Sequence, residues 1–133
     1  MSIEALADYT TEQWNAVAAS VMANIPPGLF INGKHVDALE GGRIASINPA
    51  NGQVVAEVAA GSARDVDLAV ASALKAFRAG DWSRMAPRDR MAVLYRWCEL
   101  IDANAAELAM MDTLDMGKPI ADMAGVDLPS VVQ

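Results

Sequence analysis

The chain contains few of the residues from which covalent or metal-based active sites are built. It has one cysteine and one histidine in 133 residues, so it offers neither an internal disulfide nor a paired Cys/His metal site. A single thiol fits a reducing compartment. Basic side chains are scarce as well. The balance of 10 Lys and Arg against 17 Asp and Glu gives a net charge of −7, which argues against the clustered positive surface that nucleic acids require.

Long apolar runs are also absent. No stretch approaches the roughly 20 apolar residues that span a bilayer, and the first residues lack the basic-then-apolar pattern of a secretory signal. The sequence therefore predicts a cytoplasmic protein with no membrane partner. Hydrophobic residues nevertheless make up 53% of the chain and aromatics only 5%. We expect one folded domain whose apolar faces consist mainly of small and flexible side chains.

Turn-forming residues divide the first half of the chain into two hairpins. Asn32-Gly33 lies between two short apolar runs, and this is the strongest short hairpin signal because the favoured turn needs positive φ at both residues. Residues 48–52, Asn-Pro-Ala-Asn-Gly, indicate a second turn. This turn separates strands that are predicted over residues 43–47 and 54–59.

Capping residues predict an opening helix and then a series of helices in the second half. Thr10 and Gln13 have capping-box spacing at the start of the opening helix. Ser62 is placed to cap a second helix, whose apolar residues recur every three or four positions up to a glycine end signal at Gly80. Pro87 is well placed as the first residue of the next helix.

The last long helix is predicted to begin at Asn104. We expect Asn104 and Glu107 to form a capping box there, and Gly117 and Pro119 to end the helix. A further helix is predicted to start near Pro119 and to be cut or kinked at Pro129, because proline cannot donate the helical hydrogen bond.

Isolated candidates for chemistry have simpler structural explanations. His35 lies in the first hairpin with no nucleophile or acid at motif spacing. Cys98 lies on an apolar helix stripe without the neighbouring positive charge that activates a thiol, so we expect a core cysteine. Trp82 and Trp97 are expected to be packing anchors. The residues alone define no complete active site.

Asp115 is the acidic residue whose position most needs a partner. It falls in the last turn of the predicted helix, where a negative charge opposes the helix dipole. Asp112 lies three residues earlier and adds repulsion. Compensation by Lys118 or by a bound ion is one explanation. A solvated carboxylate, or one that accepts a nearby backbone N–H, is the other.

Five blocks of sequence follow one another in an order that is far more specific than any single block. They are LFING (29–33), INPANGQVVAEVAAG (47–61), DVDLAVASALKAF (65–77), GDWSRMAPRDR (80–90) and ELAMMDTLDMGKPI (107–120). Their order and spacing resemble the start of an aldehyde dehydrogenase over residues 29–129. The opening helix with Trp14 and the sequence Asp127-Leu128-Pro129 are most similar to the bacterial branch that acts on gamma-glutamyl-gamma-aminobutyraldehyde and related amino-aldehydes.

This resemblance implies a fold and a reaction. The fold is α/β, the N-terminal segment of an aldehyde dehydrogenase cofactor domain, with short β-hairpins followed by a cluster of three to four helices. Family members oxidise an aldehyde to a carboxylic acid with NAD or NADP, using a cysteine thiolate and a glutamate-activated water. In the family these groups lie downstream of the matched region. The resemblance therefore assigns no catalytic and no cofactor-binding residue here, Cys98 included, and the chain alone is expected to be inactive and to bind no cofactor tightly.

The resemblance also implies part of a site for a monovalent cation. Several family members hold such an ion with an aspartate of the TLDMGKP-like block and with backbone carbonyls just before the NPxTG-like turn. The matching positions here are Asp115, Ser46 and Ile47. A further ligand of the family site lies downstream.

Residues 1–28 are accordingly expected to form a helical extension and residues 29–133 an incomplete cofactor-binding domain. The expected partner is the rest of a homodimeric or homotetrameric parent enzyme. A non-catalytic helical module that binds full-length subunits is the alternative. A stand-alone enzyme that uses His35 and the carboxylates is disfavoured, because no nucleophile and base occur at a suitable spacing. If the chain stands alone, its helices should expose apolar faces.

Overall fold

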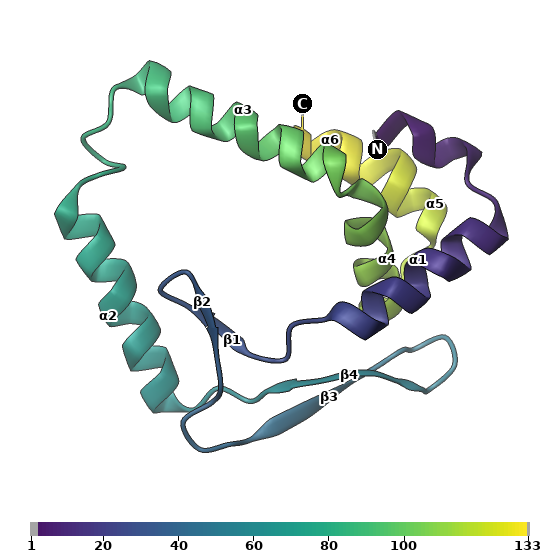
Figure 1. Ribbon diagram of the computed structural model, residues 1–133, viewed down its shortest axis with the longest axis horizontal. Coiled ribbons are helices and arrows are strands. Elements are labelled where there is room, and N and C mark those ends of the chain that lie inside the picture. Colours follow the sequence, from purple (N-terminus) through teal and green to yellow (C-terminus); the bar gives the residue numbers. More distant parts are fainter. Residues whose placement is uncertain (1–2, 133) are drawn as a thin grey trace.

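The computed structural model describes residues 3–132, a mixed α/β chain with two separate antiparallel hairpins. Its helical elements are η1 (Ile3–Asp8), α1 (Thr11–Asn24), α2 (Ala63–Ala79), α3 (Pro87–Ala103), α4 (Ala105–Met116), α5 (Ile120–Asp122), η2 (Met123–Asp127) and α6 (Leu128–Val132). Its strands are β1 (Leu29–Ile31), β2 (Lys34–Val36), β3 (Arg43–Ile47) and β4 (Val54–Ala59). The predicted order, hairpins followed by three long helices that end at Met116, is confirmed (Figure 1).

Both hairpin predictions are confirmed at their turns. Asn32 and Gly33 have φ of 54° and 73°, and they let β1 and β2 pair with Phe30 opposite His35. At the second turn Gly52 has a φ of 72°, and its N–H donates to the Asn48 carbonyl over 2.8 Å. The positive-φ residues reverse the chain within a few positions, so each pair of strands forms locally.

The first residues form two helical elements where one was expected. η1 is a 3₁₀-helix that precedes α1. The predicted capping box at α1 is confirmed, since the Gln13 N–H donates to Thr10 Oγ1 over 3.3 Å and the Thr10 N–H donates to Gln13 Oε1 over 2.8 Å. α1 packs on α4 through Val21, Met110 and Leu114. The boundary proposed at residue 28 stays a prediction.

α2 begins and ends as its sequence indicates. Ser62 caps its first turn, with Asp65 as the reciprocal member of the capping box, and Gly80 ends it with a φ of 78°. Asp65 is buried, and its carboxylate also accepts the Leu39 N–H over 3.1 Å, so it ties the helix to the segment after β2. α3 begins at Pro87, as predicted.

The capping role predicted for Asn104 is wrong. Its side-chain amide donates to the Leu100 carbonyl over 2.7 Å, so it closes the end of α3, and no side-chain hydrogen bond caps α4. The two helices are separated by Asn104 alone. Because the link is so short, the side chain lies close to the carbonyls at the end of α3 that lack a partner within the helix, and it bonds to these instead of the first N–H groups of α4.

Pro129 does not cut the last helix. The chain stays helical to Val132, and the irregularity lies one turn earlier, where η2 is a π-helix in which the Leu128 N–H donates to the Met123 carbonyl. The wider π turn changes the hydrogen-bond register just before the proline, so the residue that lacks an N–H is accommodated inside the helical path.

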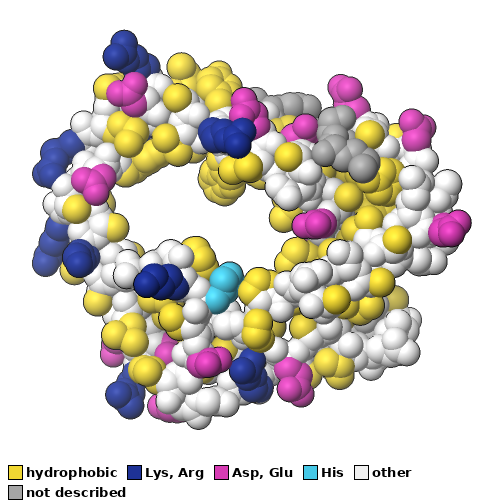
Figure 2. Space-filling view, in the orientation of Figure 1, with side chains coloured by type: hydrophobic (Ala, Val, Ile, Leu, Met, Phe, Trp, Pro, Cys, Tyr) yellow, Lys and Arg dark blue, Asp and Glu magenta, His cyan; other side chains and the backbone are white. Residues whose placement is uncertain are grey.

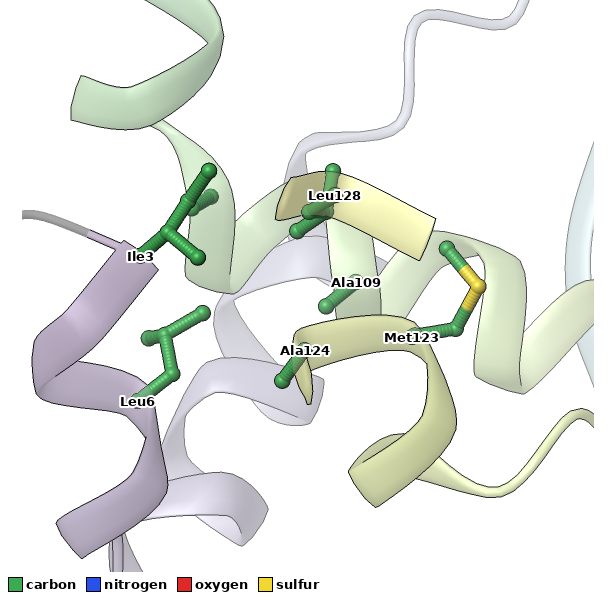
Figure 3. Packing of buried hydrophobic residues seen from close by; sticks show 7 residues of the cluster. Ile3, Leu6, Ala109, Met123, Ala124 and Leu128 are labelled. Atoms are coloured by element: carbon green, nitrogen blue, oxygen red, sulfur yellow. The ribbon is translucent and has the colours of Figure 1, made fainter. Parts of the chain in front are cut away.

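The buried core lies at one side of the molecule. Its main cluster joins η1, α4, η2 and α6, and a second, smaller cluster joins α1 to α4. Figure 3 shows Leu6, Ala109 and Leu128 pointing toward one another, with Ala109 fully buried in the middle of α4. A small residue at this position lets neighbouring helices approach closely.

On the opposite side of the molecule the described residues form no buried hydrophobic cluster. In Figure 1 the elements surround an open centre, with α2 at the left of the view, α3 along the top and the hairpins below. The space-filling view keeps this opening, and hydrophobic side chains gather along its rim beneath α3 (Figure 2). No residue of α3 is buried, and the only buried residue of α2 is Asp65. The exposed apolar faces expected for a chain that stands alone are confirmed.

The predicted core cysteine and the two tryptophans predicted to be packing anchors are therefore not buried. Cys98 is half-buried, and Trp82 and Trp97 are 47% and 61% exposed. The sequence marks these positions as apolar correctly. The described residues, however, supply no surface that packs against these side chains, so the side chains are not buried although they are apolar.

Candidate functional site

The predicted cation-site residues come from two elements that meet in space. Ser46 lies at the end of β3 and Asp115 in the last turn of α4, 69 positions later. The Ser46 hydroxyl donates to Asp115 Oδ1 over 2.6 Å. The β3–β4 register shifts between Ser46 and Ile47, as in a β-bulge, and bulges commonly redirect groups at the edge of a sheet.

A close backbone approach holds this junction together. Gly117 ends α4 with a φ of 77°, and a Cβ placed on it would lie 2.7 Å from Pro49 Cγ. The turn after β3 therefore rests directly on the end of α4. Both a positive φ and this lack of space require glycine at position 117. The junction explains why two residues so far apart in sequence share one hydrogen bond.

Lys118 does not compensate the charge of Asp115. Its ammonium pairs with Asp127 at the end of η2, and this hydrogen bond raises the pKa of Lys118. Asp115 instead meets the Ser46 hydroxyl, a neutral donor, and remains exposed to solvent. Asp115 therefore has the nearby partner that was expected, and this partner is a side chain. No Lys, Arg or His of the described residues pairs with its negative charge.

The donor set at this junction is made of oxygen atoms only. A carboxylate, a hydroxyl and the neighbouring peptide carbonyls suit a hard cation better than a soft transition metal. Among residues 3–132 no three His, Cys, Asp or Glu side chains come together as a metal-binding group. The residues present therefore fit part of a shell for a hard cation, and they supply a single formal negative charge.

The other sequence candidates lie apart from this junction. His35 stacks on Phe30 with ring centroids 5.2 Å apart, which is a packing role on the first hairpin. Cys98 lies within α3, away from the N-terminus of the helix and without an ion-pair partner among the described residues, so nothing there would stabilise its thiolate. No nucleophile and base meet among these candidates.

Sequence reasoning missed two charged contacts. One is the buried capping box, in which hydrogen bonds from Ser62 and then from Leu39 hold the pKa of Asp65 below its ordinary value. The other is the ion pair between Lys118 and Asp127. The capping spacing at Ser62 pointed toward the first contact. No signal in the sequence pointed toward the second contact, in which Asp127 is the last residue of the π turn.

Comparison with known proteins identifies the class to which this arrangement belongs. The sequence model of the aldehyde dehydrogenase family matches residues 35–133, and the chain belongs to that family. It is 44% identical to the aminoacetaldehyde dehydrogenase of Pseudomonas aeruginosa over 91% of its own length and 24% of that protein.

Solved structures agree with this assignment. An indole-3-acetaldehyde dehydrogenase from P. syringae, determined in complex with NAD+, matches with a TM-score of 0.85 and 42% identity, over 91% of this chain and 24% of that one. The gamma-glutamyl-gamma-aminobutyraldehyde dehydrogenase of Burkholderia cenocepacia matches with a TM-score of 0.87 and 41% identity, over 93% and 25%. This chain thus spans about a quarter of the length of these relatives. Within the described part of the chain, no helix is long and apolar enough to cross a membrane.

Proposed function

We propose that this chain is the N-terminal part of an NAD(P)-dependent aldehyde dehydrogenase that oxidises an amino-aldehyde to the carboxylic acid. The observation that carries the proposal is the family match over residues 35–133 together with a backbone that is similar to a solved relative over 93% of the chain. One sequence relative and one solved relative are named for amino-aldehydes. A further relative was solved with NAD+, which favours that cofactor in the parent enzyme.

Catalysis is proposed to require the part of the enzyme that this chain does not contain. Neither of the single residues Cys98 and His35 meets a partner for acyl chemistry, and covalent catalysis needs nucleophile, base, oxyanion donors and cofactor in one place. We expect the purified chain to show no turnover with aminoacetaldehyde and NAD or NADP, followed at the absorbance of the reduced nicotinamide. Turnover that survives repurification would overturn this part of the proposal.

The parent enzyme is proposed to be a cytoplasmic homodimer or homotetramer.

The alternative function, a non-catalytic module that binds full-length subunits, is favoured by the exposed apolar residues of α2 and α3. Mixing the chain with the full-length P. aeruginosa enzyme distinguishes this module from the N-terminal part of an enzyme. A stable mixed species on size exclusion would favour the module, and an unchanged oligomer would favour the enzyme part.

A monovalent cation is proposed at the junction of β3 and α4. Asp115 would hold it with the carbonyl oxygens of Ser46 and Ile47, and the ion would offset the carboxylate at the negative end of the helix dipole. We expect Na⁺ or K⁺ to raise the unfolding midpoint above that in a bulky organic cation at equal ionic strength. Asp115→Asn should remove this difference. An equal midpoint in all three salts would leave Asp115 as a hydrogen-bonded surface carboxylate.

A further inference from the structure

A cavity lies where the first helices of the chain meet its last helical turns. It measures about 970 Å³ and is bounded by η1, α1, the end of α3, and the turns α5, η2 and α6. Leu6 of η1 and Ala124 of η2 line it, and both belong to the main buried cluster (Figure 3). Pockets for small organic molecules have volumes of this order, and they combine apolar walls with a few polar groups.

An aromatic pair forms part of the cavity wall. Tyr9 and Trp14 both line the cavity, and their ring centroids lie 4.8 Å apart with an angle of 50° between the ring planes. Both side chains are half-buried, so part of each remains accessible. An aromatic ring attracts a cation that lies over its face within about 6 Å of the centroid, and tryptophan does so most strongly.

The charged residues that line the cavity are both acidic. Glu4 is exposed on η1, and Asp102 is half-buried in the last turn of α3. Asp102 Oδ1 accepts the Ile3 N–H over 2.8 Å, which holds this carboxylate at the cavity. Among residues 3–132, no Lys, Arg or His lines the cavity or forms an ion pair with either carboxylate.

The position of Asp102 in its helix strengthens the need for a cation. A carboxylate in the last turn lies at the negative end of the helix dipole, and this turn of α3 contains no basic residue. Positive charge at this end of the cavity would therefore be stabilised by the carboxylate and by the helix together.

We propose that this cavity binds an alkylammonium ion. Its ammonium group lies at Asp102 and Glu4, and its alkyl chain lies along Leu6, Trp14 and Ala124. A fatty acid would bring a third negative charge to the cavity. A bare inorganic cation would leave the apolar wall uncovered, and a neutral apolar molecule would leave both carboxylates without a counter-charge.

The proposed site is separate from the junction of β3 and α4. None of Ser46, Ile47 and Asp115 lines the cavity. The site also goes beyond the proposed function, because binding to the chain requires no dehydrogenase activity.

Hexylammonium chloride is the probe, because an aliphatic amine, like a lysine side chain, is protonated at neutral pH. Hexanol keeps the tail without the charge, hexanoate reverses the charge, and ammonium chloride supplies the head group alone, all at equal ionic strength. The indole N–H resonances of Trp14, Trp82 and Trp97, assigned by single Trp→Phe variants, report where each compound binds in NMR titrations of the chain.

We expect hexylammonium to shift the Trp14 resonance with a Kd of about 1 mM or tighter, and to leave those of Trp82 and Trp97 in place. The other three compounds should bind at least about tenfold more weakly. A shift at Trp82 or Trp97 with Trp14 unmoved would place the alkyl chain on the exposed helices and overturn the proposal. So would equal binding of hexanol, which would leave a pocket without preference for cations.

Three charge-removing variants test the carboxylates. Asp102→Asn keeps an oxygen that can accept the Ile3 N–H, and it should weaken hexylammonium binding by at least about tenfold. Glu4→Gln, at an exposed position, should weaken binding by about two- to fivefold. Glu12→Gln is the matched control, because Glu12 is exposed on α1 and does not line the cavity, and it should have less than about a twofold effect.

Equal losses with Asp102→Asn and Glu12→Gln would reduce the binding to a general attraction to an acidic chain, and would refute the site. Circular dichroism shows whether each variant keeps the fold. Should Asp102→Asn alter it, the comparison of hexylammonium with hexanol on the unchanged chain decides, since that comparison needs no variant.

Discussion

Replacing Gly117 by alanine tests the junction between α4 and the β3–β4 turn. The substitution forces a residue with a Cβ to a φ of 77° and places that Cβ 2.7 Å from Pro49 Cγ. The left-handed conformation costs about 1–2 kcal/mol for a residue other than glycine, and relieving the overlap costs about 1–3 kcal/mol more. We expect the free energy of unfolding to fall by about 2–5 kcal/mol in total.

Gly52→Ala provides the matched control for this prediction. Gly52 has a φ of 72°, but a Cβ there would meet no atom within 4 Å. This variant should therefore lose only the conformational part, about 1–2 kcal/mol. Urea unfolding, followed by tryptophan fluorescence and circular dichroism, gives both values.

A double-mutant cycle isolates the contact itself. Pro49→Ala removes the Cγ that Gly117→Ala would meet, so the double variant should be more stable than the sum of the single effects predicts, by most of the overlap energy. Additive effects, or a Gly117→Ala cost no greater than that of Gly52→Ala, would refute the close approach of the turn to α4. The Ser46–Asp115 hydrogen bond would then lose its structural explanation.

Two further predictions concern the helices. The pKa of Asp65 lies below its ordinary value of 3.8 in the folded chain, so its stabilisation is complete above pH 3.8 and is lost as the pH falls through the lower, folded-state value. The difference in unfolding free energy between the chain and Asp65→Asn should therefore shrink as the pH falls through that window. A difference that does not change with pH would contradict the link between this pKa and stability. Ala109→Leu should cost about 1–3 kcal/mol because Ala109 is fully buried between helices, whereas Ala92→Leu on exposed α3 should change stability by less than about 0.5 kcal/mol in the same urea titration. Equal effects of the two leucines would place Ala109 outside the core.

Local chemistry allowed most element boundaries to be predicted. Asn32-Gly33 and residues 48–52 produced the expected turns, and Ser62, Gly80 and Pro87 mark the ends of helices as expected. These signals act within a few residues, because capping and turn geometry depend on neighbouring backbone groups. The wrong prediction for Asn104 also concerns near neighbours in the chain, since the ends of two consecutive helices compete for its side chain.

Periodicity could not tell whether an apolar face is covered. It marked Cys98 and Trp97 as packing residues, and the structure leaves them on a helix without a buried residue. Burial depends on a second surface, and the described residues supply none that buries a side chain of α3. The π turn before Pro129 was not predicted either, and two of its residues, Met123 and Ala124, pack in the buried cluster with α4 and η1.

The sequence by itself therefore determined the elements, their order and the family to which the chain belongs. Only the tertiary structure decided that Ser46 reaches Asp115, that Lys118 pairs with Asp127, and that the large apolar residues of α2 and α3 stay exposed. The physical reason is distance along the chain. Turns and caps are decided between near neighbours, whereas these contacts, and their absence, depend on surfaces brought together from distant segments.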